Sequence, residues 1–451
     1  MKILQKFKKY LNYVLIFCAE EYIIILIKKG ENKMLIDFSF KNFMSFGDEC
    51  RFDMIANSDK QHRESLIDDK YSRVRLIYGA NASGKTSFIR AISFVRWFIF
   101  NSNQLLENMP IPVVPFKFRR DAKNIPSEFS LTFIMHEKKY HYEFSCTQDR
   151  VIYEKLDVYN TSKPTNIFER TNTDTYEFKR DVRMLRDIES KTTRNKLFLA
   201  TSANWNYPLT KPVVEFLLNT LLPYSFNEQW QAHLAKIKAD GHFEDYKRFC
   251  LKFFNNADLS IDDFAIEEKK FKEMQKDPVL NSIVSLIAQG KEEAIEQIEN
   301  SPVYNINIQH AIMDGDAEEK YILNLREESL GTIQMFQLSP ILYHVFQKGI
   351  TFFVDEIDRS LHPILVRYIV SLFLDPEINA NNAQLIANTH DTNLLDLELL
   401  RRDEIWFTER DFNSGKTIMY PLTDFSPRKN ENIEKAYILG RFGAVPFIRE
   451  V

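Results

Sequence analysis

Apolar and polar positions alternate through much of the first third of the chain. This two-residue period predicts half-buried strands at 35–40, 50–55, 129–135, 139–146 and 152–159. A short, wholly apolar run at 74–78 predicts a buried strand, and helical spacing over 85–100 predicts an amphipathic helix soon after it. We therefore expect an antiparallel β subdomain beside a strand–loop–helix unit.

The pattern changes after residue 182. Helical spacing prevails at 212–222, 230–239, 243–254 and 279–288, with strand character returning at 262–267 and 306–313. Further on, helices are predicted at 334–346 and 363–374, and strands at 350–354, 383–388 and 404–407. Because strands that alternate with helices form largely parallel sheets covered on both faces, the predicted fold class is α/β. We expect one lobe at 34–181, a helical insertion at 182–300 and a second lobe at 301–451.

The first 33 residues allow three interpretations. The stretch 10–27 is apolar and has lysines on both sides, as in a membrane segment, but Glu20 and Glu21 interrupt it. A spanning helix needs about 20 apolar residues, and charges at its centre are costly. It could instead be an additional amphipathic helix. The third interpretation is a translation start at Met34, since the codons of Gly30-Glu31 can form a ribosome-binding sequence.

The overall composition is that of a globular protein. The chain has 451 residues, of which 44% are hydrophobic and 27% charged, and its net charge is −4. No basic excess therefore indicates nucleic-acid binding. The four cysteines are far apart and form no C-x-x-C pair, so neither a zinc site nor a disulfide framework is predicted, and a cytoplasmic location fits.

A glycine-rich loop follows the predicted strand at 74–78. Residues Gly79-Ala80-Asn81-Ala82-Ser83-Gly84-Lys85-Thr86 fit the P-loop pattern G-x-x-x-x-G-K-[ST], in a chain with only 12 glycines. In such loops, backbone N–H groups and a helix N-terminus surround phosphate oxygens. We expect Lys85 to contact the β- and γ-phosphates of ATP, and the Thr86 hydroxyl to bind Mg²⁺.

The apolar strand at 350–354 ends in two carboxylates, Asp355 and Glu356. Asp355 is predicted to hold Mg²⁺ through water, as the acidic partner of the P-loop, and Glu356 to act as general base toward the attacking water. Solvated acids at a strand end are the structural alternative. Lys85 and Asp355 are separated by 270 positions (355 minus 85). Such wide spacing is typical of ABC-type heads, as in SMC-like and OLD-like proteins.

Two further motifs lie where an ABC head would have its signature and its switch histidine. In 328–334, Ser329 and Gly331 could present a hydroxyl and an N–H to the γ-phosphate of a second subunit. The alternative is an ordinary helix N-cap, and Leu330 departs from the L-S-G-G-Q pattern of transporters. His390 follows the predicted strand at 383–388 and is placed like a histidine that contacts the γ-phosphate.

Taken together, these motifs resemble the bacterial ABC-type AAA-family ATP-binding proteins of the RloA and AbiL kind, which are related to OLD and SMC heads. The segments that carry the resemblance are 42–46, 79–87, 328–332, 355–358, 361–363, 389–391, 401–406 and 437–447. The resemblance implies an ABC-type head with Lys85, Thr86, Ser87, Asp355, Glu356 and His390 at the nucleotide. It also implies a glutamine that contacts Mg²⁺, for which Gln104 and Gln148 are both candidates.

The resemblance further implies a role in defence against bacteriophage. Its ATPase would form ATP-dependent homodimers and control an effector encoded nearby, such as a Toprim-like nuclease, in response to DNA or a phage protein. No nuclease constellation is visible in this chain, so cutting would fall to the partner. The alternative is a stand-alone DNA-binding ATPase of the SMC or repair type, which a salt-sensitive association with DNA would favour. A transporter subunit fits poorly, because the head is not compact and the signature is unconventional.

Overall fold

The computed structural model describes residues 13–14, 27–28, 33–122, 124–224, 230–270, 302–314, 317–428 and 431–446. The chain forms two compact units. The first comprises Met1–Phe226, Val345–Arg359 and Pro363–Val451, and the second comprises Asn227–His344 with Ser360–His362.

The first unit contains an antiparallel sheet of seven strands, in the order β10-β9-β8-β7-β6-β3-β4. Its strands are β3 (Met34–Lys41), β4 (Cys50–Asp53), β6 (Ser127–Met135), β7 (Lys138–Cys146), β8 (Val151–Tyr159), β9 (Pro164–Thr171) and β10 (Thr175–Glu177). The predicted antiparallel subdomain is confirmed. The sequence pattern missed β9, because it buries Asn166 and Arg170 among its apolar residues and so shows no clean alternation.

The second sheet of this unit is mainly parallel and has the order β11-β15-β16-β5-β17-β18. Its strands are β11 (Leu221–Tyr224), β15 (Thr351–Val354), β16 (Gln384–Asn388), β5 (Val74–Gly79), β17 (Ile405–Arg410) and β18 (Thr417–Pro421), of which β18 alone is antiparallel to its neighbour. The α/β fold class is thereby confirmed. The helix predicted over 212–222 ends earlier, since α5 (Lys211–Thr220) gives way to β11 at Leu221, whose backbone is extended.

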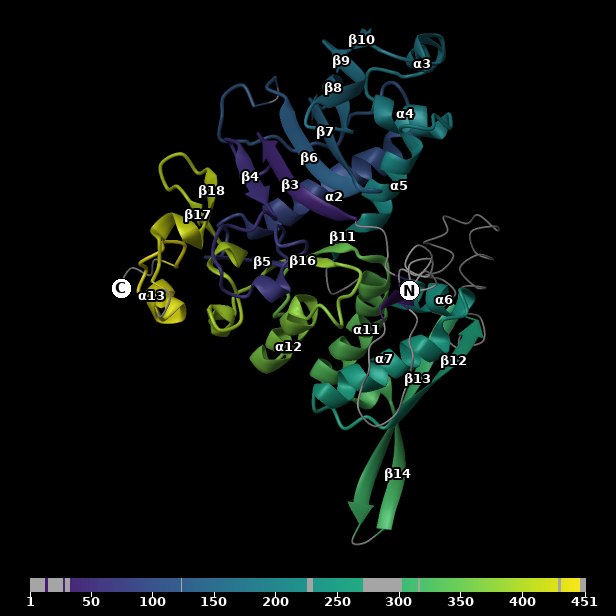
Figure 1. Cartoon of the computed structure of the whole chain (residues 1–451), viewed down its shortest axis with the longest axis vertical. Helices are drawn as coiled ribbons and strands as arrows, with labels where there is room; N and C mark the ends of the chain where they lie inside the picture. The colour runs from purple at the N-terminus through teal and green to yellow at the C-terminus, as the bar shows by residue number, and fades with distance from the viewer. Residues whose placement is uncertain are drawn as a thin grey trace, which may run out of the picture. The chain divides into compact units, whose positions relative to one another are not determined.

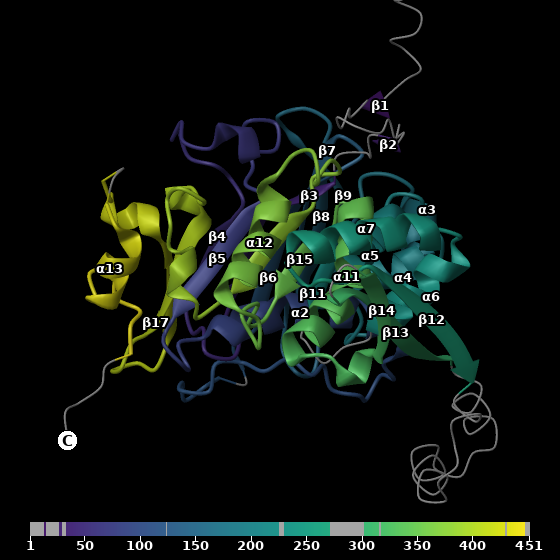
Figure 2. The same cartoon turned by 90° about the horizontal axis from the view of Figure 1, so that it is seen from below.

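Helix α2 (Lys85–Asn101) joins the two sheets of this unit into one core (Figure 1). Phe88 on α2 contacts the rings of Phe40 and Phe52 from the antiparallel sheet. The same apolar cluster includes Phe353 and Ile386 from the parallel sheet. Helix α12 (Pro363–Leu374) lies against β5 and β16 (Figure 2). The P-loop strand is therefore covered on both faces, as the sequence predicts.

Shorter elements complete this unit. They are α3 (Val182–Glu189), α4 (Phe198–Asn204), α13 (Ile433–Ile438) and the 3₁₀ turns Arg63–Ser65, Ser102–Gln104, Thr392–Leu394, Arg402–Glu404 and Leu422–Phe425. Near the N-terminus, β1 (Tyr13–Val14) pairs antiparallel with β2 (Ile27–Lys28), so these four residues are not helical. The remainder of 1–32 lies outside the described residues. Among the helices that are described, none has the length and apolar character needed to cross a membrane.

The second unit combines helices with a three-stranded antiparallel sheet. It contains α6 (Trp230–Ala239), α7 (Phe243–Asn256), β12 (Asp263–Lys270), β13 (Pro302–Asp314), β14 (Ala317–Asn324), the 3₁₀ turn Leu325–Glu327 and most of α11 (Leu330–Lys348). Its core packs Phe254, Phe264 and Phe336 against one another.

This division differs from the predicted insertion at 182–300. Helices α3 to α5 and strand β11 belong to the first unit, and the second unit contains a sheet as well as helices. Strand β14 has no sequence signal, because its successive residues Tyr321, Ile322 and Leu323 are all exposed and no alternation results. The helix predicted at 279–288 lies outside the described residues.

Candidate nucleotide-binding site

The predicted strand, loop and helix around the P-loop are all present. Strand β5 ends at Gly79, and α2 begins at Lys85, with Gly84 as its N-cap residue. Gly84 has φ 113°, a left-handed conformation that side chains rarely adopt, and an added Cβ would lie 2.4 Å from a hydroxyl oxygen of Thr417. Position 84 therefore requires glycine. A Cβ on Gly79 would lie 2.4 Å from the carbonyl oxygen of Thr408, so the loop also approaches β17 too closely for a side chain there.

Strands β17 and β18, which follow β5 on one side of the sheet, hold the loop in place. The Ser83 hydroxyl lies 2.7 Å from the Thr408 hydroxyl on β17, and both residues are buried. The Thr417 hydroxyl on β18 donates to the Ser83 carbonyl at 2.8 Å and contacts the Ser45 hydroxyl at 2.9 Å. These hydrogen bonds tie the loop to β17 and β18. Neither threonine could be recognised from the sequence, since a lone threonine in a strand is common.

Lys85 points back into the loop. Its ammonium group donates to the Gly79 carbonyl at 2.6 Å and to the Ala80 carbonyl at 3.1 Å. Burial lowers the pKa of Lys85 to about 8, although nearby carboxylates, with Asp358 the strongest, oppose this decrease. The lowered pKa reflects the cost of burying a cation. The negative charge of a bound phosphate would offset this cost.

The two predicted Mg²⁺ ligands lie side by side. The Thr86 hydroxyl at the start of α2 donates to Asp355 Oδ1 at 3.1 Å, although the two residues are 269 positions apart. They meet because β15 and β5 are parallel strands of one sheet, separated only by β16. A hydroxyl and a carboxylate are oxygen donors of the type that Mg²⁺ prefers, so the donor set fits this ion. Thr86 and Asp355 are the residues that would hold it.

Glu356 directly follows Asp355 and is exposed. Its backbone has φ 58°, which is left-handed and disfavoured for a glutamate. Its N–H donates to the side-chain oxygen of Asn388 at 2.6 Å. The chain therefore turns sharply at the end of β15 and presents a carboxylate outside the sheet, as a general base requires.

His390 lies just beyond β16, at the same edge of the sheet as Asp355. Its backbone N–H donates to Asp358 Oδ2 at 3.1 Å, and the residue is exposed. Partial burial, assisted by the positive charge of Lys85, lowers the pKa of His390 below its usual value. The ring is therefore mainly neutral at pH 7 and can form a hydrogen bond to a phosphate oxygen through either nitrogen.

The predicted signature residues lie at the start of α11 in the second unit. Ser329 Oγ accepts a hydrogen bond from the Thr332 N–H at 3.1 Å, so Ser329 caps this helix. This is the role that the alternative interpretation of the motif, an ordinary helix N-cap, predicts. A Cβ on Gly331 would meet nothing closer than 3.8 Å, so the fold itself does not demand glycine there. A contact of Ser329 and Gly331 with nucleotide stays a prediction.

Of the two candidate glutamines, Gln104 lies far from the loop. It follows the C-terminal end of α2, whose 17 residues separate it from the P-loop by roughly 25 Å at 1.5 Å per residue. That candidate is wrong as a Mg²⁺ ligand. Gln148 donates to the Val113 carbonyl at 3.2 Å, and its role stays untested.

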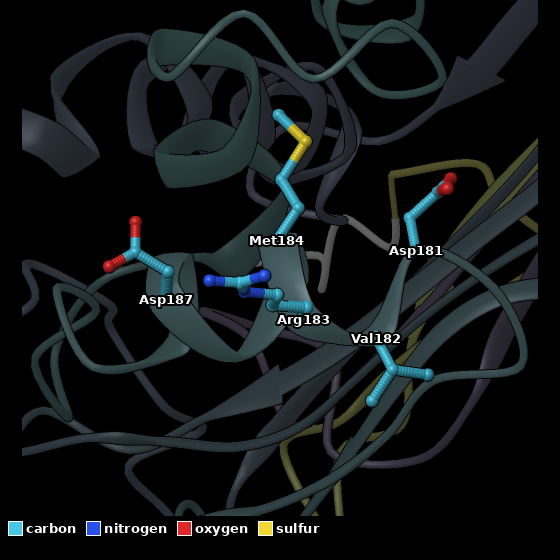
Figure 3. A pocket seen from close by; sticks show the side chains of 5 residues that line it. All are labelled: Asp181, Val182, Arg183, Met184 and Asp187. Atoms are coloured by element: carbon cyan, nitrogen blue, oxygen red, sulfur yellow. The ribbon is translucent and has the colours of Figure 1, made fainter.

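Away from the P-loop, the described chain has a hollow on α3 and no candidate metal cluster. A hollow of about 550 Å³ on α3 is lined by Asp181, Val182, Arg183, Met184 and Asp187, and these side chains spread outward instead of converging (Figure 3). Among the residues that the structure describes, no group of three or more histidine, cysteine, aspartate or glutamate side chains could bind a metal ion. Cys50, Cys146 and Cys250 are buried free thiols.

The sequence matches one family of known proteins, and several solved structures are similar to the chain. The family model described as "AAA domain, putative AbiEii toxin, Type IV TA system" matches residues 76–396. Among curated proteins, none matches the sequence. One similar solved structure is an SMC head domain from Thermotoga maritima, with 14% identity over 86% of this chain and 98% of that chain and a TM-score of 0.39. Another is cbiO1 from Clostridium perfringens, part of an ABC transporter complex, with 11% identity over 91% of this chain and 98% of that chain and a TM-score of 0.34. A third is an Smc head with an extended coiled coil, bound to the C-terminal domain of ScpA derived from Pyrococcus furiosus (13%, 91% and 99%, TM-score 0.39). At these identities and TM-scores, the likenesses say nothing of this chain's activity or partners.

Proposed function

Since the chain belongs to the family of AAA domains described as putative AbiEii toxins of type IV TA systems, we propose that it binds and hydrolyses ATP at the site around Lys85, Asp355 and Glu356. The observation that supports this most strongly is the hydrogen bond between Thr86 and Asp355. It joins the two residues that would share Mg²⁺, beside a lysine whose ammonium group is confined by the loop. A lysine, a hydroxyl and a carboxylate in this arrangement are suited to binding a phosphate together with a divalent cation.

In this proposal, each group has one task. The N–H groups of the loop and of the first turn of α2 bind the phosphates, and Lys85 neutralises the β- and γ-phosphate oxygens. Mg²⁺, when bound by Thr86 and Asp355, supplies charge stabilisation at the phosphates. Glu356 accepts a proton from the attacking water, and neutral His390 forms a hydrogen bond to the γ-phosphate.

We further propose that ATP brings two copies together. Ser329 and Gly331 of one copy would complete the site of the other, because the exposed start of α11 offers a hydroxyl and a positive helix end. A site that faces outward, with Glu356 and His390 exposed, is suited to closure by a second subunit. The ATP-bound dimer would then control an effector in an RloA- or AbiL-like anti-phage system.

Mixing two inactive variants tests the shared site. Lys85→Ala removes the P-loop cation but leaves the signature intact, and Ser329→Arg does the reverse. Each alone should be inactive, while an equal mixture should regain roughly a quarter of wild-type turnover, since half the dimers are mixed and each of these has one complete site. A mixture that stays inactive would contradict the shared site.

The role in defence is tested by isolating the tagged protein from cells that carry its native operon. We expect a co-purifying protein encoded next to it, whose retention changes with Lys85→Ala. Recovery of the protein alone, with nucleic acid that high salt removes, would instead favour a stand-alone DNA-binding ATPase.

A further inference from the structure

Asn388 contacts three consecutive residues that follow β15. It is the last residue of β16 and is fully buried. Its side-chain N–H₂ donates to Asp355 Oδ1 at 2.5 Å, and its side-chain oxygen accepts from the Glu356 N–H at 2.6 Å. Its backbone carbonyl accepts from the Ile357 N–H at 3.1 Å. One residue thus reaches both of the carboxylate-bearing positions of the site.

We propose that Asn388 is a positioning residue for ATP hydrolysis, which orients the Asp355 carboxylate and fixes the backbone turn at Glu356. This inference rests on the proposed ATPase function. The parallel register places Val354 opposite Ala387, so Asn388 lies beside Asp355 on the neighbouring strand. Asp355 Oδ1 accepts from Asn388 on one side and from Thr86 on the other, which leaves the carboxylate little freedom to rotate.

The chemistry of the amide group explains why asparagine suits this position. An amide carries a donor and an acceptor on one planar group, so it can serve a carboxylate and an N–H at the same time. Aspartate would keep only the acceptor, and leucine has neither. The bond to the Glu356 N–H also holds a left-handed backbone, at φ 58°, that glutamate does not favour.

A second buried asparagine in the same unit provides a contrast. Asn379 is also fully buried, and its side chain donates to the carbonyls of Phe373 and Ala383 and accepts from the Ala383 N–H. These bonds close the loop between α12 and β16 and involve no residue of the nucleotide site. Asn379 is therefore a matched control for the loss of a buried amide.

The experiment compares Asn388→Leu and Asn388→Ala with Asn379→Ala. For each, kcat and KM for ATP are measured at saturating Mg²⁺. A displaced fluorescent ATP analogue reports ATP affinity in EDTA and across a Mg²⁺ titration, and thermal melting reports folding. The Mg²⁺ titration of binding is independent of turnover.

For both Asn388 variants, we expect the Mg²⁺ concentration that gives half of the Mg²⁺-dependent change in ATP binding to rise by about 10- to 100-fold. We expect kcat to fall by a similar factor. KM and ATP affinity in EDTA should stay within about twofold of wild type, since the P-loop itself is untouched. Asn379→Ala should lower the melting temperature only.

Folded Asn388 variants with the kcat and Mg²⁺ requirement of wild type would overturn the inference, even if they melt earlier. The alanine variant serves if the leucine variant does not fold. Failure of the proposed function looks different, because wild type itself would then bind no ATP in EDTA and hydrolyse none, and the inference would fall with it.

Discussion

The confined ammonium group of Lys85 predicts a pH dependence of ATP binding. Burial lowers the pKa of Lys85 to about 8 in the protein without nucleotide, against an ordinary value of 10.5. The phosphates of ATP favour the charged ammonium and would raise this pKa again. ATP binding is then coupled to proton uptake above about pH 8, so affinity falls as the pH rises.

The size of the effect follows from the two-state titration. With a pKa of about 8, roughly nine-tenths of the Lys85 side chains are charged at pH 7 and roughly one-tenth at pH 9. ATP affinity should therefore decrease about tenfold between these pH values, which corresponds to about 1.4 kcal/mol. The terminal phosphate of ATP takes up a proton toward the acid end of this range, and the Lys85→Met variant, which keeps that titration, is the control for it. Measuring in EDTA removes any contribution from Mg²⁺.

The assay is displacement of a fluorescent ATP analogue from pH 6.5 to 9.5. Lys85→Met should bind ATP more weakly at pH 7 and should lose the pH dependence, because the titrating group is gone. Lys155→Met, which removes a lysine on β8 outside the site, should keep the wild-type slope. A flat wild-type profile, or an equal slope in Lys85→Met, would refute the argument.

Three further predictions concern stability and loop shape. Gly84→Ala should lower the free energy of unfolding by about 1–3 kcal/mol and weaken ATP binding, since φ 113° is strained for alanine; chemical denaturation and ATP titration measure this, and wild-type values would contradict it. Thr408→Val leaves the buried Ser83 hydroxyl without this partner and should cost about 1–3 kcal/mol by denaturation, whereas an unchanged midpoint would show that the contact contributes nothing. Although partial burial lowers the pKa of His310, the hydrogen bond that its ring donates to the Glu328 carboxylate raises it overall. The stabilising contribution of this pair is therefore complete below about pH 6.5 and is lost as the pH rises through the folded pKa. Melting of wild type and His310→Gln should accordingly differ more at pH 6 than at pH 8.5, and an equal difference would contradict this.

The sequence predicted those parts of the site whose chemistry imposes a pattern. The P-loop needs small residues at fixed spacing, and Asp355 must end a buried strand, so both were visible before the fold was known. Their contact through Thr86 follows from the parallel sheet that alternating strands and helices imply. Neither Gln104 nor Gln148 could be chosen, because a lone glutamine carries no pattern.

The missed features share a physical cause. Asn388, Thr408 and Thr417 act through single hydrogen bonds between strands that are distant in sequence, and no local period reports such contacts. Strand β11 was assigned to the end of a helix because its leucines continue the helical spacing, while its place in the sheet is decided by pairing with β15. Propensity is overridden by tertiary pairing in such short segments.

The most direct test of the account is ATP hydrolysis by the purified protein and by Glu356→Gln, with Glu398→Gln as the control for loss of an exposed glutamate. We expect wild type and Glu398→Gln to hydrolyse ATP in Mg²⁺ at similar rates. Glu356→Gln should bind ATP normally but turn it over at least about 100-fold more slowly, because it lacks the general base. Hydrolysis by Glu356→Gln at the wild-type rate, or a wild-type protein that binds no ATP, would contradict the central claim.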